Sequence, residues 1–272
     1  MFMFWLEMFV EFISFYLLIL VFGYLLPAGQ FYYVYHVRDR EKYAERRIQA
    51  RLPAPESIRR EVRLSLVTIL IFALLSTVVF QFYKDGDTAL YWNVFDYPLW
   101  YLPVSFVLCL VIHDTYFYWT HRLMHWRPIF KYCHQGHHRS LTPTPWAIFA
   151  FQPLEAVIQF AGVALIIFYL PLHPFVLFAY LSIDSFINTA GHTGFEMVPP
   201  SVARHWLFRG WNTVTHHDLH HTNVRVNYGA FFNVWDRLMG TFLDDSAAKE
   251  GARSEQHDGA TPTSTPAERT AP

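Results

Sequence analysis

Two long apolar runs in the first third of the chain predict membrane-spanning helices. The first run, residues 8–26, is apolar except for Glu11. Its length of about 19 residues is enough to cross a hydrocarbon core of ~30 Å at about 1.5 Å per residue. No basic segment precedes this run and no small-residue cleavage motif follows it, so we expect an uncleaved anchor rather than a signal peptide. The second run, residues 64–83, carries no charge and predicts a second full span.

A third apolar run starts near Leu99 and continues without a break into the histidine-rich stretch HDTYFYWTHRLMH. We expect this helix to leave the membrane at its polar end. Two shorter apolar runs, residues 154–170 and 175–190, are joined by PLHP and lie at the lower length limit for a span. They predict a helical hairpin that enters the membrane and returns to the same side.

The polar segments predict the orientation of these helices. Residues 38–63 carry nine Lys/Arg against five Asp/Glu, and short basic loops stay in the cytoplasm. The histidine-rich end of the third span and the chain after the hairpin would share that side. The membrane would be the inner membrane in a bacterium or the endoplasmic reticulum in a eukaryote. The predicted fold is an all-α integral membrane helical bundle with two full spans, a third span extending into the cytoplasm, a short helical hairpin and a cytoplasmic histidine-rich helical cap.

Three regions follow from this pattern. Residues 1–98 hold the N-terminal transmembrane helices and the basic loop, residues 99–245 hold the histidine motifs, and residues 246–272 predict a disordered tail. The composition agrees with a membrane protein, because 53% of residues are hydrophobic and only 16% are charged, against about 25% in globular proteins. A net charge of −1 gives no reason to expect a nucleic-acid partner.

Clustered histidines supply the candidate chemistry. In HRLMH, His121 and His125 are four residues apart on a predicted helix, so both rings project from one face and suit one metal centre. Asp114 lies seven residues before His121, on nearly the same face. Its carboxylate could accept the second ring N–H of a ligating histidine and select its tautomer. A helix-surface or capping role for Asp114 is the equally weighted alternative.

The pattern H-x-x-H-H occurs twice after this helix, and we expect the three histidines of each copy to share one helical face. Two such motifs on one side of a membrane are far less expected by chance than one. His192 follows the hairpin into the same compartment, four residues after Asn188. We expect Asn188, like Asp114, to support a ligand and not to bind the metal itself. The candidate metal ligands are His121, His125, His134, His137, His138, His192, His217, His220 and His221.

Nine imidazoles are too many for one metal, because a structural zinc site uses four ligands and a catalytic one about three. They predict two metals with open coordination positions. Imidazole suits iron, zinc, copper and nickel, so ligand type leaves the metal open. No H-E-x-x-H motif supplies a hydrolytic base, which favours redox chemistry on a lipid. The alternatives are a metal-dependent membrane lipid hydrolase and a non-enzymatic metal-handling membrane protein.

The motifs together are similar to a known family. HDTYFYWTHRLMH, HQGHHRSLTPTPWA, GHTGFE, HHDLHH and NYGAFFNVWDRLMGT closely resemble the fatty acid hydroxylase/sterol desaturase superfamily over residues 99–245. The resemblance implies a membrane-bound non-haem di-iron oxidoreductase of lipid biosynthesis that uses O2 to hydroxylate or desaturate a sterol or fatty-acyl lipid. It implies two iron ions held by the nine histidines, with His192 matching the family's extra histidine near the hairpin exit. It also implies a substrate from the bilayer and a separate electron donor, such as ferredoxin or a cytochrome b5-like protein.

One position departs from the family pattern. Gln152 stands where many relatives have histidine. Glutamine donates and accepts hydrogen bonds but is a poor metal ligand. The departure leaves the overall assignment standing and leaves the substrate open.

Overall fold

The computed structural model describes residues 2–49 and 51–244 of the chain. Every regular element within these two ranges is helical, and β-pairing is limited to isolated bridges such as Arg47 with Phe195. The all-α prediction is therefore confirmed. The predicted disordered tail, residues 246–272, lies outside the described residues.

The first helix is longer than the sequence pattern indicates. It comprises α1 (Phe2–Leu18), the π-helical η1 (Ile19–Leu25), α2 (Leu26–Tyr32) and the π-helical η2 (Tyr33–Arg38). Residues Met3–Arg38 form one candidate membrane span. This helix contains the apolar run at residues 8–26 and extends beyond both of its ends. Proline lacks the N–H that an α-helix interior needs, but the π-helical turn immediately before it changes the hydrogen-bond register, so the helix continues.

Two further helices are long and apolar enough to cross a membrane, as predicted. Helix α3 (Pro55–Asp85) begins with Pro55 in its first turn. Its C-cap is Gly86, whose φ of 83° lies in the left-handed region that glycine adopts most easily. It starts nine residues before the predicted apolar run, since the basic residues ahead of Leu64 are helical too. Helix α4 (Tyr101–Met124) runs unbroken from the apolar segment into HRLMH, which confirms that the third span carries the first histidine motif.

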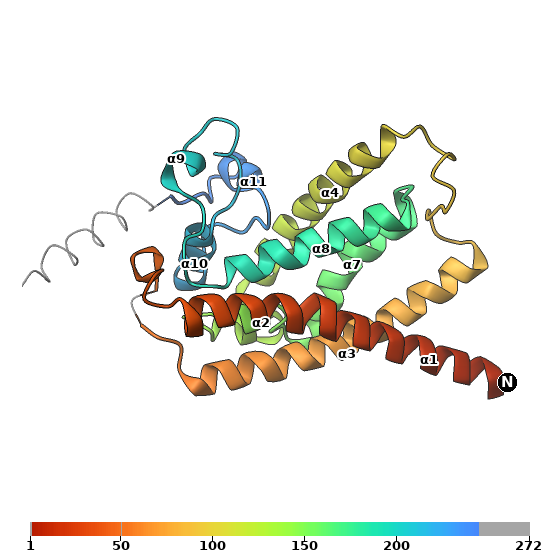
Figure 1. Cartoon of the computed structure of the whole chain (residues 1–272), viewed down its shortest axis with the longest axis horizontal. Coiled ribbons are helices and arrows are strands. Elements are labelled where there is room, and N and C mark those ends of the chain that lie inside the picture. Colours follow the sequence, from red (N-terminus) through yellow and green to blue (C-terminus); the bar gives the residue numbers. More distant parts are fainter. Residues whose placement is uncertain (1, 50, 245–272) are drawn as a thin grey trace, which may run out of the picture.

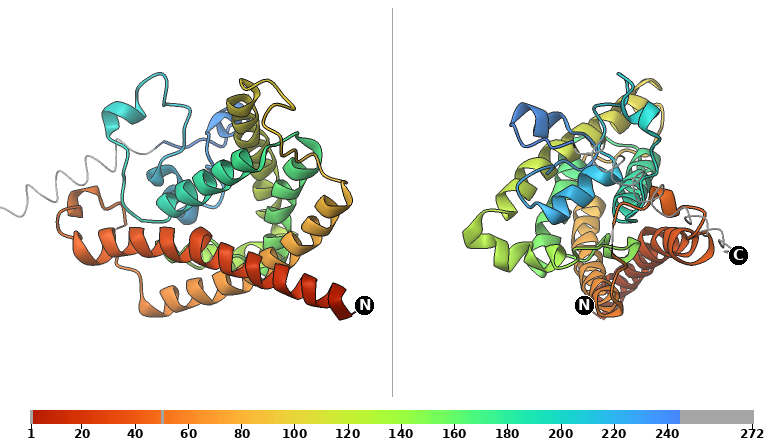
Figure 2. Two further views of the ribbon diagram at one scale, coloured as in Figure 1. Left: turned by 45° about the vertical axis from the view of Figure 1, so that its right-hand side comes forward. Right: turned by 90° about the vertical axis from the view of Figure 1, so that its left-hand side faces the viewer.

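The predicted hairpin is present as α7 (Pro153–Tyr169) and α8 (Pro174–Gly191). Helix α7 packs against α3 and α4, whereas α8 packs against α4 and α2, and α1 packs along α3. Figures 1 and 2 show these helices as a bundle whose members cross at open angles. Its buried core between α4, α7 and α8 includes Cys109, Ile166 and Tyr180.

Short helices cover one end of the bundle. They are η3 (Ala44–Arg46), α5 (Arg127–Cys133), α6 (Gln135–His138), η4 (Pro145–Ala147), α9 (Pro200–Ala203), α10 (Val214–Thr222) and α11 (Val234–Leu238). The connection between α2 and α3 lies at the same end as α9, α10 and α11, opposite the N-terminus (Figure 1). The buried carboxylate of Asp236 accepts hydrogen bonds from the backbone N–H groups of Tyr228 (2.9 Å) and Gly229 (2.8 Å), which orders the loop between α10 and α11.

The outer faces of the bundle are apolar. Large hydrophobic side chains are exposed on α1, α3 and α4, for example Phe9 (60%), Leu74 (57%) and Val107 (54%). Exposed apolar surface this extensive is unfavourable in water and marks contact with lipid or protein. Together with the three long apolar helices, it defines an integral membrane protein.

Candidate metal centre

The nine predicted ligands form two adjacent groups at the capped end of the bundle. Within each group, one ring nitrogen from every histidine lies within 4.8 Å of the others. The first group comprises His121, His125, His134, His138 and His220. The second group comprises His137, His192, His217 and His221. The tertiary structure thus brings all nine candidates together and divides them between two centres.

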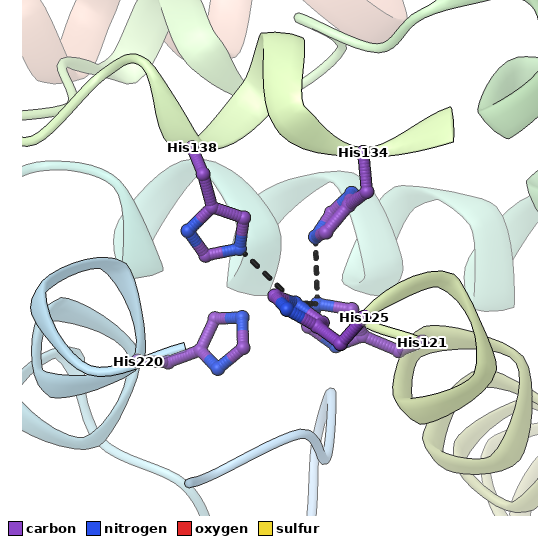
Figure 3. A group of neighbouring side chains, drawn as sticks. All are labelled: His121, His125, His134, His138 and His220. Atoms are coloured by element: carbon purple, nitrogen blue, oxygen red, sulfur yellow. Dashed lines mark hydrogen bonds between the residues drawn. The ribbon is translucent and has the colours of Figure 1, made fainter. Parts of the chain in front are cut away.

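The rings of the first group converge on a common point (Figure 3). The Nε2 atom of His121 is 2.9 Å from Nε2 of His134 and 3.3 Å from Nε2 of His125, and Nε2 of His138 is 3.2 Å from Nε2 of His125. Nitrogens that share one ion at about 2.1 Å sit roughly 3 Å apart. The spacing therefore fits several imidazoles around a single cation.

The second group has the same spacing. The Nε2 atom of His192 is 3.0 Å from Nε2 of His217 and 3.4 Å from Nε2 of His137, and Nε2 of His221 is 3.2 Å from Nε2 of His217. His192 directly follows α8, while its partners come from α6 and α10. The end of α8 therefore contributes one histidine to the second group, and the short helices α6 and α10 contribute the other three.

Each H-x-x-H-H motif is shared between the groups, which corrects the prediction that its three histidines act on one face. His134 and His138 belong to the first group and His137 to the second, whereas His217 and His221 belong to the second and His220 to the first. At about 100° per residue, the third and fourth following positions point about 100° apart. One motif placed between two ions can therefore face both.

Backbone carbonyls select the ring tautomers. Nδ1 of His121 lies 2.9 Å from the carbonyl oxygen of Tyr228, Nδ1 of His220 lies 2.7 Å from that of Val226, and Nδ1 of His192 lies 2.7 Å from that of Asn188. A carbonyl can only accept, so each Nδ1 carries the proton and each Nε2 offers its lone pair to the group.

The donor set fits metal ions. Buried ring nitrogens of His125, His137, His138, His220 and His221 have no hydrogen-bond partner among the described residues, and for His220 the orphan is Nε2 itself. Burial lowers the pKa of His137 and His220 well below the usual value and that of His192 to about 4, so these rings are neutral at pH 7. Neutral imidazole is the ligating form, and a cation in the first group would satisfy the orphaned Nε2 lone pair of His220. The other four orphans are Nδ1 atoms, on the side of each ring away from the Nε2 that faces its group.

Asp114 and Asn188, the two polar residues predicted to support the ligands, have different contacts: Asp114 binds backbone groups, and Asn188 contacts His192 through its backbone. The carboxylate of Asp114 accepts hydrogen bonds from the backbone N–H groups of Phe231 (2.7 Å) and Phe232 (3.0 Å), not from a histidine ring. It therefore ties α4 to the loop that orients His121. Asn188 orients His192 with its backbone carbonyl, while its side-chain amide donates to Asp184 (2.8 Å). A direct role for either residue in the chemistry stays a prediction.

Glu155 is a functional candidate that sequence reasoning missed. It lies in the first turn of α7, fully buried, with Oε1 2.5 Å from Nδ1 of His134. Its carboxylate accepts the Nδ1–H of His134 and so selects the ring tautomer, as the backbone carbonyls do for His121, His192 and His220. The signal was available, because Glu155 is the only acidic residue in residues 153–170, an otherwise apolar run predicted to enter the membrane.

Gln152 belongs to neither histidine group. Its Oε1 accepts a hydrogen bond from the backbone N–H of Gly136 (2.7 Å), and its Nε2 donates to the carbonyl oxygen of Lys131 (3.2 Å). The side chain therefore holds the second histidine motif in place by bridging α5 and α6.

We predict that Gln152→Ala weakens this support without removing a ligand. Leaving the partly buried Gly136 N–H unpaired costs about 1–3 kcal/mol. Thermal unfolding should shift to lower temperature, and metal retention during dialysis should fall a few-fold. Gln135→Ala is the matched control, because Gln135 occupies a variable position inside the motif and its side chain makes no such bridge among the described residues. Equal metal retention in the Gln152→Ala variant and the parent would contradict the supporting role.

Fold and site together define a helical membrane protein with paired histidine clusters at one end of its bundle, and comparison with known proteins agrees. The fatty acid hydroxylase model matches residues 106–241. The chain is 32% identical over 185 residues to a Delta(7)-sterol 5(6)-desaturase of Gibberella zeae, 31% over 195 residues to human lathosterol oxidase and 34% over 154 residues to rat methylsterol monooxygenase 1. These matches cover 68%, 70% and 56% of this chain.

The chain belongs to the fatty acid hydroxylase family. It spans 55%, 62% and 52% of the length of these three relatives. No solved structure matches it significantly.

Proposed function

We propose that the protein is a membrane-bound non-haem di-iron oxidoreductase that uses O2 to hydroxylate or desaturate a lipid of the sterol or fatty-acyl class. The observation that carries the proposal is the pair of adjacent all-histidine groups at the end of an apolar helical bundle. The names of the relatives, a Delta(7)-sterol 5(6)-desaturase, a lathosterol oxidase and a methylsterol monooxygenase, favour oxidation of a lipid.

Two irons, one in each histidine group, would supply the oxidising power needed to break an unactivated C–H bond with O2. In hydroxylation one oxygen atom enters the lipid and the other leaves as water, and in desaturation both leave as water. Both reactions consume two external electrons. The neutral imidazoles provide ligands without adding negative charge, which suits iron but does not require it.

The residues of the chain position the ions and limit access to them. The backbone carbonyls of Tyr228, Val226 and Asn188 and the carboxylate of Glu155 aim four rings inward. A largely apolar cavity of about 430 Å³ lies against His192 and His217 and includes Phe117 and Phe231 in its wall. A lipid carbon could approach the second group through this cavity with little water around it.

The orientation in the membrane is also a proposal. The basic segment of residues 38–63, which includes the start of α3, is tied to the residues after the second histidine motif. Arg60 donates to the carbonyl oxygen of Arg139 (2.8 Å), and Gln49 donates to that of Pro143 (3.1 Å). Basic short loops face the cytoplasm. We therefore place the metal centre on the cytoplasmic side, where a soluble donor such as ferredoxin or a cytochrome b5-like protein could deliver electrons.

Within the described residues, no observation favours the alternatives. Each histidine group contains only imidazole, and Glu155 is engaged by His134 rather than placed as a hydrolytic base. His121 and His125 lie in the last turn and at the C-cap of α4, His192 directly follows α8, and the remaining ligands lie in or beside α6 and α10. The ligands are therefore gathered at helix ends and not spaced along the spans, which disfavours a metal-transport path.

Lipid mass spectrometry of a host with and without the gene, grown under air, tests the proposed function. We expect one lipid class to gain one oxygen atom or to lose two hydrogen atoms. No change in any lipid, despite a loaded metal centre and a working electron donor, would overturn the proposal. Zinc in a hydrolytically active preparation that consumes no O2 would instead support the hydrolase alternative.

A further inference from the structure

A second cavity, separate from the space beside His192 and His217, lies deeper within the bundle. Its volume is about 330 Å³, and its walls come from α1, α3, α4, α7 and α8, the helices whose arrangement Figure 2 shows. Most of the lining is apolar, with aromatic side chains such as Phe72, Phe149 and Phe160. Phe117 and Asn188 line both cavities, so the deeper one adjoins the space beside the metal centre.

His113 and Asp184 interrupt the apolar lining of this deeper cavity. Both lie on helices of the bundle, α4 and α8. An ionisable side chain is energetically costly there, so its presence marks a candidate functional residue. Their side chains are 10% and 19% exposed, so both are largely buried yet open to the cavity. Neither takes part in the histidine groups.

Hydrogen bonds among the described residues leave one donor and one acceptor of this pair available. The Tyr180 hydroxyl hydrogen-bonds Nδ1 of His113, and when it donates there the ring proton resides on Nε2. The side-chain amide of Asn188 donates to Oδ1 of Asp184 at 2.8 Å. The His113 Nε2 and Asp184 Oδ1 atoms are 3.9 Å apart, beyond hydrogen-bond distance. A donor and a carboxylate therefore face the cavity side by side without satisfying one another.

This pair complements a hydroxyl group. The oxygen of a hydroxyl accepts from His113 Nε2–H while its hydrogen is donated to the carboxylate of Asp184. An alkane offers neither interaction, and the carboxylate of a free fatty acid would be repelled by Asp184. The surrounding apolar walls suit a hydrocarbon skeleton.

We propose that His113 and Asp184 form a recognition site for the hydroxyl group of a neutral lipid bound in the deeper cavity. The proposal rests on the proposed lipid oxidation and names the chemistry of the substrate. His113 precedes His121 by eight residues on α4, and Asp184 precedes His192 by eight residues at the end of α8, a rise of about 12 Å in each case. A hydroxyl anchored there holds the skeleton at a set distance from both groups, so the pair acts as positioning residues.

Photo-crosslinking to the purified, iron-loaded full chain tests this site. Diazirine-bearing probes would be a 3-hydroxysterol, its 3-deoxy counterpart, a long-chain alcohol and the matching fatty acid. We expect the hydroxyl probes to bind roughly tenfold better than the deoxy and acid probes. The deoxy probe would leave the buried His113 and Asp184 side chains without a hydrogen-bond partner, and the acid would be repelled by Asp184. The crosslinks should map to peptides that line the cavity, on α1, α3, α4, α7 and α8. Comparison of the sterol with the long-chain alcohol then shows which skeleton carries the hydroxyl.

Two variants separate recognition from structure. Asp184→Leu should abolish the preference for hydroxyl probes, whereas Asp184→Asn keeps an acceptor, removes the negative charge and should admit the fatty acid. Ser182→Ala, whose hydroxyl bonds only the carbonyl oxygen of Phe178 on an exposed face of α8, is the matched control and should behave as the parent.

The outcomes distinguish this site from the proposed function. Equal binding of hydroxyl and deoxy probes by the parent, or crosslinks only outside the residues that line the cavity, would overturn the recognition site even if lipid oxidation is found. Continued exclusion of the fatty acid by a folded Asp184→Asn variant would also overturn it. Selective hydroxyl binding without any oxidised lipid would leave the site standing and overturn the oxidation.

Discussion

Replacing His137 by alanine is expected to abolish lipid oxidation while the protein still inserts into the membrane. His137 is one of four ligands of the second group, and its Nε2 lies 3.4 Å from Nε2 of His192. Its removal opens one metal position and leaves the first group complete. Iron should fall from two ions towards one per chain, and turnover should fall more than roughly 100-fold, beyond the loss expected for a residue that only supports a ligand.

The control for this prediction is His205→Ala. His205 is exposed in the segment between α9 and α10 and lies in neither histidine group. Its replacement should leave iron content and turnover unchanged. The measurements are metal content by mass spectrometry, the membrane-bound fraction and product formation. Turnover of the His137→Ala variant close to that of the parent would remove His137 from the centre.

Replacing Glu155 should lower the affinity for iron when the new side chain cannot accept a hydrogen bond from His134. Glu155→Gln keeps an oxygen for the His134 N–H, whereas Glu155→Leu leaves that N–H unpaired. Loss of such a supporting partner typically costs 10–100-fold in metal affinity or activity. We expect the leucine variant to reach that range and the glutamine variant to retain most of the affinity.

Iron titration in the presence of a competing chelator would measure this effect. Glu56→Gln is a matched control, because Glu56 is an exposed carboxylate at the start of α3 that pairs only with exposed Arg59 (2.8 Å). Its iron affinity should equal that of the parent. Identical affinities of the leucine variant and the parent would show that His134 does not depend on Glu155 for its orientation.

The structure agrees with the sequence wherever the signal is local. Apolar runs long enough to span a membrane predict α3 and α4, because their length and hydropathy are properties of consecutive residues. The first helix is longer than its apolar run at residues 8–26, because it continues past Pro27 to Arg38 through the π-helical turns around α2. A sequence pattern can mark a proline as a helix breaker, but it cannot show that the neighbouring turns change register.

The residues that support the histidines show most clearly what the sequence could not predict. Spacing along α4 suggested that Asp114 would bind a ligating ring, yet its carboxylate binds the backbone of Phe231 and Phe232, more than a hundred residues away. The carboxylate that does bind a ring, Glu155, comes from a different helix. Helical spacing predicts which side chains share a face, but not which distant segment packs on that face.

The sequence by itself determined the class of this protein: an all-helical membrane chain carrying nine clustered histidines, since motif spacing and hydropathy are written in consecutive residues. Only the tertiary structure decided how those histidines divide between two centres. That division depends on how α6 and α10 are oriented about their own axes between α4 and the end of α8. It places His137 in the other group from His138, and His220 in the other group from His221. Packing of distant helices sets those rotations, so no local pattern could contain them.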